Sequence, residues 1–183
     1  MSLKTFVKIG KINNLSDARY CAGMMVDILG FNLEEGTNGY VNPEMFKEIS
    51  DWLAGVDFCG EFAIAQPAEI KLATINYNIQ FVEVQDVAIL EELSDLDVKL
   101  ILKYTIEEAS DLDHLNAHIE LAQDFVEHVI IYNTKPELSN DIQKKVATLS
   151  EELSIIRGYD LSVANAPEIA NGNTFSGIEL VGS

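Results

Sequence analysis

Short apolar runs alternate regularly with longer amphipathic segments along this chain of 183 residues. The short runs are rich in Val, Ile, Leu and Phe, which is typical of strands that are buried on both faces. They predict strands at Thr5–Ile9, Asp27–Asn32, Val56–Ala63, Gln80–Val84, Val98–Tyr104, His128–Asn133, Ser154–Arg157 and Phe175–Leu180. The amphipathic segments predict helices at Ser16–Met24, Pro43–Leu53, Pro67–Ile75, Val87–Leu93, Ile106–Phe125, Ser139–Glu152 and Ser162–Ala170.

Strands that alternate with helices are typical of parallel βαβ units. Right-handed crossovers then leave two architectures, an open doubly wound sheet and a closed (βα)8 barrel. The number of predicted strands favours the barrel. The chain is shorter than the ~200 residues at the small end of that fold. We therefore expect one minimal barrel domain, residues 1–183, with short loops and a truncated or missing last helix.

The composition is that of a globular protein with a strongly acidic charge balance. Hydrophobic residues make up 48% of the chain, and 30 acidic side chains against 12 basic ones give a net charge of −18. This charge repels nucleic acid and anionic lipid, so we expect no nucleic-acid partner and no membrane association. No apolar segment approaches the ~20 residues that cross a bilayer, and no signal peptide is recognisable, so we expect a cytoplasmic protein.

Few residues suggest a disulfide, a metal or a cofactor. Cys21 and Cys59 are too few and too far apart for a disulfide framework, and we expect buried, reduced thiols. His114 and His118 have a spacing that can present two imidazoles on one helix face, but no third ligand is apparent. We therefore expect no metal and no cofactor. The single tryptophan, Trp52, is expected to anchor its helix on the barrel.

Seven segments share their order and residue pattern with one enzyme family. They are Lys8–Ile12, Asp17-Ala18, Asp27–Phe31, Tyr40–Glu44, Gly60–Phe62, Phe81–Val84 and Phe175–Glu179. They are similar to the segments K-I-C-G-I/L-T, D-A, G-A-D-x-x-G-F, R-Y-V-S/T-P-E, G-V-F, V-Q-L-H and S-S-G-V-E. In this pattern the chain resembles the phosphoribosylanthranilate isomerase family over most of its length.

The resemblance implies a (βα)8 barrel, a phosphorylated small-molecule ligand and no cofactor, in a monomer or a homodimer. It implies the Amadori rearrangement of a phosphoribosyl amine in tryptophan biosynthesis, an aldose–ketose isomerisation. The chain departs from the family at three site positions. The family's general base, the cysteine of K-I-C-G, is replaced by Gly10, and its general acid, an aspartate that ends strand six, is replaced by Asn133. The arginine that meets the anthranilate carboxylate is replaced by Gly39.

Charged residues interrupt the apolar strands at Lys8, Glu61, Glu83, Lys103, Arg157 and Glu179. Catalytic groups of (βα)8 barrels come from the C-terminal ends of the strands, so each of these positions is a candidate. One interpretation makes Glu61, Glu83 and Asn133 catalytic. Lys8, Lys103 and Arg157 then bind an anionic group of the ligand. The alternative is a purely structural ion network.

A phosphate cradle is expected beside these charges. The resemblance assigns it to Gly158, after strand seven, and to Ser176 and Gly177, which we interpret as the end of strand eight. Backbone N–H groups at such turns bind phosphate. Three functions remain open at this point: the family's isomerase, a non-catalytic phosphate-ligand-binding or regulatory barrel, and an enzyme whose altered chemistry uses the strand charges.

Overall fold

The computed structural model describes residues 5–149, 153–162, 164–172 and 174–182. It is a closed barrel of parallel strands in the order β1 to β8, with β8 paired to β1. The strands are β1 (Phe6–Gly10), β2 (Ile28–Asn32), β3 (Asp57–Glu61), β4 (Phe81–Val84), β5 (Lys99–Ile106), β6 (Val126–Asn133), β7 (Ser154–Arg157) and β8 (Gly177–Val181).

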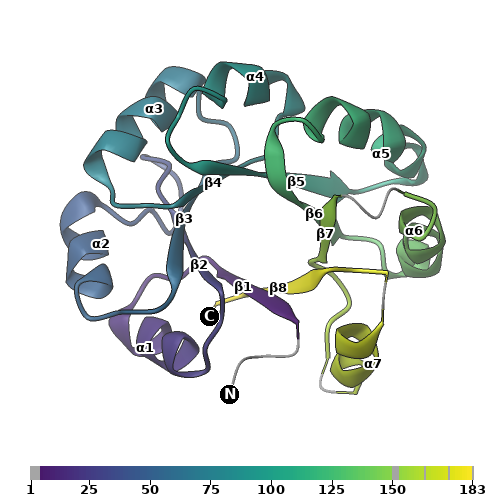
Figure 1. Ribbon diagram of the computed structural model, residues 1–183, viewed down its shortest axis with the longest axis horizontal. Coiled ribbons are helices and arrows are strands. Elements are labelled where there is room, and N and C mark those ends of the chain that lie inside the picture. Colours follow the sequence, from purple (N-terminus) through teal and green to yellow (C-terminus); the bar gives the residue numbers. More distant parts are fainter. Residues whose placement is uncertain (1–4, 150–152, 163, 173, 183) are drawn as a thin grey trace.

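Helices form a ring outside the strands (Figure 1). They are α1 (Leu15–Gly23), α2 (Pro43–Ser50), α3 (Pro67–Asn76), α4 (Leu90–Leu93), α5 (Ala109–Ala122), α6 (Ser139–Val146) and α7 (Ala166–Asn171), with the 3₁₀ turns η1 (Val87–Ile89) and η2 (Pro136–Leu138). The predicted (βα)8 barrel is therefore confirmed. No helix follows β8 in the described part of the chain.

Several predicted helices have wrong boundaries. The segment expected to be helical from Ile106 begins instead as the end of β5, because Ile106 pairs with Asn133 of β6 and is fully buried. The helix expected at Ser139–Glu152 ends at Val146, and residues 150–152 lie outside the described residues. The last helix is shorter than expected, since α7 begins only at Ala166. Within the described ranges, the structure contains no helix with the length and apolar character of a membrane span.

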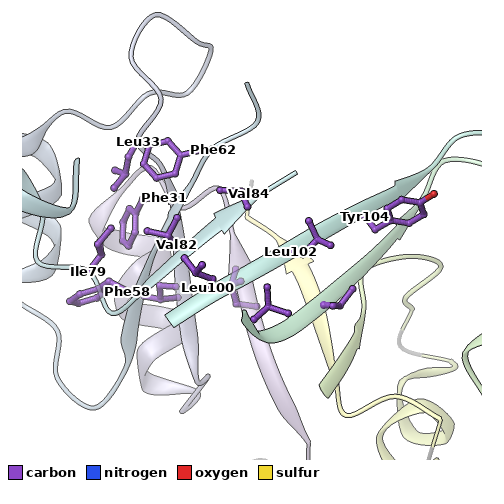
Figure 2. Close-up of a cluster of buried hydrophobic side chains, with 14 of the residues drawn as sticks. Phe31, Leu33, Phe58, Phe62, Ile79, Val82, Val84, Leu100, Leu102 and Tyr104 are labelled. Atoms are coloured by element: carbon purple, nitrogen blue, oxygen red, sulfur yellow. The ribbon is translucent and has the colours of Figure 1, made fainter. Parts of the chain in front are cut away.

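Two apolar layers hold the barrel together. The outward-facing strand residues, including Phe31, Val82 and Leu102, pack beneath the helices, and Figure 2 shows part of this layer on β2 to β5. Inside the barrel a smaller cluster fills the lower half, and it comprises Ile28, Cys59, Phe81, Ile101, Ile130 and Ile156. Because strand side chains alternate between the two faces, the residue two places beyond each inner one points into the upper half.

The expectation that Trp52 anchors its helix was wrong, since Trp52 is 71% exposed. It lies beyond the last residue of α2, off the buried face of that helix. Phe46 and Ile49 are the residues that bury α2. The ring of Phe46 packs edge-on against Phe31 and Phe58, with centroids 5.0 and 5.6 Å away. Of the two cysteines, Cys59 is buried as expected, whereas Cys21 is only partly buried, so the expectation was wrong for Cys21.

Candidate functional site

Five charged side chains from five strands meet inside the upper half of the barrel. We call this set, Lys8, Glu61, Glu83, Lys103 and Glu179, the buried charge cluster. Lys8 Nζ lies 2.5 Å from an oxygen of Glu61, 2.7 Å from one of Glu83 and 2.7 Å from one of Glu179. Lys103 Nζ lies 2.7 Å from Oε2 of Glu179 and 3.6 Å from Oε1 of Glu83. The structure thus brings together four of the predicted site residues, with Glu179 beside them.

Two glycines make room for the Glu61 carboxylate. A Cβ atom at Gly10 would lie 2.7 Å from Glu61 Oε1, and a Cβ atom at Gly30 would lie 2.7 Å from its Cδ atom. The next residue, Lys11, has a φ angle of 57° and donates its backbone N–H to Glu61 Oε2 at 3.1 Å. The space beside Gly10 and Gly30 is therefore filled by a carboxylate from β3.

The ammonium groups of the cluster are held in their charged form. Burial by itself lowers the pKa of Lys8, but the carboxylates of Glu61, Glu83 and Glu179 outweigh it and raise this pKa well above its ordinary value. Burial also lowers the pKa of Lys103, but the carboxylates of Glu83 and Glu179 outweigh burial, so the pKa of Lys103 is raised. Both lysines therefore remain cations at neutral pH.

The carboxyl groups of Glu83 and Glu179 differ in their proton affinity. Burial raises the pKa of Glu83, and the neighbouring Lys8 and Lys103 only partly oppose this. Burial also acts on Glu179, but Lys8 and Lys103 both attract and hydrogen-bond its carboxylate, so its pKa is lowered. Glu83 Oε2 forms an ion pair with Lys8 Nζ at 2.7 Å but accepts no hydrogen bond from a described residue, whereas Lys8 donates hydrogen bonds to Glu61 and Glu179. Of Glu83 and Glu179, Glu83 is thus the one better suited to carry a proton.

The three glutamates of the cluster also have the spacing of a metal-ligand set. One oxygen from each of Glu61, Glu83 and Glu179 lies within 4.8 Å of the others. The Lys8 ammonium, however, contacts an oxygen of all three and supplies the positive charge at their centre. A lysine at this place takes the position that a metal ion would need.

A cavity of about 630 Å³ opens above the cluster at the C-terminal ends of the strands, which we call the upper mouth. Glu61, Glu83 and Lys103 line it, whereas Lys8 and Glu179 lie beneath them. Side-chain exposure in the first three is small, at 11%, 4% and 12%. The floor of the upper mouth is therefore two glutamate side chains and an ammonium group in contact with a cavity large enough for a small molecule.

Arg157 does not belong to the upper mouth. It pairs with Ile178 on the outward face of the sheet, and its guanidinium lies 4.5 Å from the ring centroid of Tyr159. Its Nε donates a hydrogen bond to the Tyr159 carbonyl at 3.0 Å, and it forms an ion pair with Asp160. The expectation that it faces the other strand charges was wrong, because Arg157 has the opposite strand parity from the inward-facing Ile156.

Asn133 is likewise directed away from the cavity. Its side chain accepts a hydrogen bond from the backbone N–H of Lys135 at 2.9 Å and donates one to the carbonyl of the same residue at 2.7 Å. It closes the turn after β6. The inward position at this end of β6 belongs to Tyr132, whose ring lies 5.3 Å from Lys103 Nζ.

The expected phosphate cradle is not assembled at the upper mouth. Gly177 is the first residue of β8, not near its end, so Ser176 and Gly177 lie at the lower end of the barrel. A Cβ atom at Gly177 would lie 2.6 Å from the carbonyl oxygen of Phe6. Gly158 is at the correct end, but its N–H donates to the Ile131 carbonyl at 2.9 Å. The predicted strand, Phe175–Leu180, already has Ser176 and Gly177 near its start, so the error was to interpret them as the end of that strand.

Several residues of the upper mouth were missed. Gln85, directly after β4, and Thr105 and Tyr132, on β5 and β6, line the cavity. Glu34 lines it as well, and its carboxylate accepts the backbone N–H groups of the β3–α3 loop. Inward strand parity, counted from Glu83, Lys103 and Ile130, would have identified the first three.

Comparison with known proteins supports the fold. No protein-family model and no curated protein matches the chain. Phosphoribosylanthranilate isomerase from Thermotoga maritima matches with a TM-score of 0.78 at 16% identity, over 97% of this chain and 87% of that one. The enzyme from Thermus thermophilus gives 0.76 at 18%, over 96% and 86%. A phosphoribosylanthranilate isomerase in complex with reduced 1-(o-carboxyphenylamino)-1-deoxyribulose 5-phosphate gives 0.75 at 16%, over 97% and 87%.

These structural neighbours have the fold that the segment pattern implied, from end to end. At such low identity the likeness establishes the architecture, and the chemistry must be argued from the residues of the upper mouth.

Proposed function

We propose that the upper mouth binds a small sugar-like ligand and transfers protons on it, in the manner of an aldose–ketose isomerase with altered groups. The observation that carries the proposal is the floor of the cavity, where Glu61, Glu83 and Lys103 stand side by side at the catalytic end of the barrel. A proton acceptor, a proton donor and a cation are what such a reaction requires.

Each group has a role that its environment supports. Glu61, a carboxylate at the cavity, removes the proton from the carbon next to the ligand carbonyl. Glu83, whose pKa burial raises, gives its proton to the carbonyl or ring oxygen. Lys103 stabilises the negative charge that develops on this oxygen. The first proton is then delivered to the former carbonyl carbon, while the hydroxyl group on the neighbouring carbon gives its proton to Glu83 and becomes the new carbonyl. The isomerisation is thereby completed, and Glu83 restored, without an oxidant or a metal.

The phosphorylated ribosyl amine of tryptophan biosynthesis is implied by the resemblance only. Gly10 offers no side chain, and the amide of Asn133 is bound to Lys135, so neither supplies the chemistry that the family's base and acid supply. We therefore expect no turnover of this substrate.

Deuterium exchange tests the proposal. The protein is incubated in D2O with a panel of aldoses and ketoses, phosphorylated and not, and loss of the proton next to the carbonyl is followed by NMR. We expect exchange with a subset of the panel that Glu61→Gln abolishes. Glu127→Gln, which removes a half-exposed carboxylate paired with Lys99 outside the upper mouth, is the matched control and should leave the exchange rate unchanged.

A binding protein without turnover is the second candidate. It is favoured by the internal pairing of the cluster, since Glu61 and Glu179 already contact ammonium groups without any ligand. Ligand binding without exchange on any sugar of the panel would favour this candidate and overturn the first.

A further inference from the structure

We infer that the ligand of the upper mouth is an unphosphorylated polyhydroxy compound, neutral or bearing an amine, and that Gln85, Thr105 and Tyr132 determine its binding. The inference takes the upper mouth as the ligand site, as the proposed function does, but does not depend on turnover. Three features of the cavity support it: its backbone N–H groups, its charges and its unpaired polar side chains.

Four backbone N–H groups at the cavity are already bonded within the protein. Gly182 donates to the Gly10 carbonyl at 2.7 Å, and Lys11 donates to Glu61. Ala63 and Ile64 donate to the two oxygens of Glu34 at 2.9 and 3.1 Å. Phosphate sites of parallel barrels and nests depend on free N–H groups of this kind. Here the Glu61 carboxylate already accepts the N–H group of Lys11, and the Glu34 carboxylate accepts those of Ala63 and Ile64.

The charges of the cavity also oppose a phosphate. Four carboxyl groups line it, those of Glu34, Glu61, Glu83 and Glu107, against the two ammonium groups of Lys11 and Lys103. Lys103 is engaged by Glu179 and Glu83 from below. A phosphate dianion would therefore face an excess of carboxylates, in a chain whose net charge is −18. An amine or a neutral hydroxyl group meets no such repulsion.

Unpaired polar side chains lie along one wall of the cavity. Gln85, Thr105 and Tyr132 line it, and none of their side chains hydrogen-bonds to another described residue. Thr105 and Tyr132 are register partners on β5 and β6, directly above Lys103 and Ile130. An amide, an aliphatic hydroxyl and a phenol donate and accept hydrogen bonds, as sugar hydroxyl groups do. This wall provides the complement to a row of ligand hydroxyl groups.

Equilibrium binding to matched sugars tests the inference. Isothermal titration of the full chain compares ribose with ribose 5-phosphate and glucosamine with glucosamine 6-phosphate at millimolar concentrations. We expect the unphosphorylated member to bind at least about tenfold more tightly in one of the pairs. Raising the salt concentration should narrow this difference, because screening weakens the repulsion of the phosphate.

Variants of the wall provide the second part of the test. Thr105→Val and Tyr132→Phe should each weaken binding of the preferred sugar by about threefold to tenfold, the loss of one hydrogen bond. Thr74→Val, which removes the same hydroxyl on α3 outside the cavity, should not change it. Circular dichroism of each variant confirms that the barrel is retained.

The outcomes separate this inference from the proposed function. Equal or tighter binding of the phosphorylated member, unchanged affinity in both wall variants, or no binding of any sugar would overturn the inference. Exchange in D2O confined to phosphorylated sugars would overturn it and leave the proposed function standing. Selective binding of an unphosphorylated sugar without exchange would support the inference and refute the proposed chemistry.

Discussion

Replacing Lys8 with methionine is the most direct perturbation of the buried charge cluster. Lys8 is fully buried, and its ammonium contacts three carboxylates at 2.5–2.7 Å. Lys8→Met keeps an unbranched apolar side chain of similar length and removes only the charge and its hydrogen bonds. Lys103 would still contact Glu83 and Glu179, so Glu61 is the carboxylate left without an ammonium partner.

The size of the effect can be worked out from this geometry. Removing one partner of a buried ion pair typically costs about 3–5 kcal/mol. The stranded carboxylate can instead bind a proton, which costs about 1.36 kcal/mol for each pH unit above a glutamate's ordinary value of about 4.3. That alternative costs about 3.7 kcal/mol at pH 7 and about 1 kcal/mol at pH 5. The loss of unfolding free energy should therefore be close to 4 kcal/mol at pH 7 and smaller by about 2.7 kcal/mol at pH 5.

The direction of the pH effect follows from proton binding. The folded variant holds a proton that the unfolded chain releases at neutral pH, so its stability falls as the pH rises from 5 to 7. Urea unfolding followed by circular dichroism at both pH values measures the difference from wild type. Lys47→Met is the control, since the Lys47–Asp51 pair on α2 is exposed and its loss should cost no more than about 0.5 kcal/mol. A Lys8→Met loss below about 1 kcal/mol at pH 7, or an equal loss at both pH values, would refute the reasoning.

Three further predictions use the same unfolding measurement. Gly30→Ala should cost about 1–3 kcal/mol, because the added Cβ overlaps the Glu61 carboxylate, whereas Gly23→Ala, with open space around it, should cost nothing. Glu83→Gln should flatten the pH dependence of stability; burial raises the pKa of Glu83, so its contribution is present at low pH and lost as the pH rises through that raised value. Identical pH profiles would contradict this. Trp52→Ala should change stability by less than about 1 kcal/mol because the side chain is largely exposed, and a larger loss would contradict its placement.

The sequence predicted the architecture well because the strands are buried on both faces. Their continuous apolar runs, separated by amphipathic segments, specify eight strands with a helical segment between each strand and the next. The boundary between a strand and the following helix was misplaced where an apolar residue suits both elements, as at Ile106, which belongs to β5. Trp52 shows a second limit: hydrophobicity alone does not place a side chain inside when it lies past the end of its helix.

The site was predicted in part, and strand parity explains which part. Lys8 and Glu83 each lie between apolar neighbours, which face the helices, so the charged residue must point into the barrel. Arg157 is the last residue of β7 after two isoleucines, where the pattern carries no parity signal. The roles expected for Asn133 and Ser176 at the cavity were assigned from the resemblance. The resemblance does not fix the position of each residue along its strand, and a shift of one residue turns a side chain to the other face of the sheet.

Gly10 on β1 and Glu61 on β3 form a single structural feature, because the space left by the glycine holds the carboxylate of the glutamate. The Glu61 carboxylate fits only because positions 10 and 30 carry no side chain, and its charge is tolerated only because Lys8 stands beneath it. A side chain placed at position 10 would displace this carboxylate, so a side chain at that position of β1 and the present acidic floor exclude each other. The interior of the upper mouth therefore depends on its two glycines as much as on its glutamates and lysines.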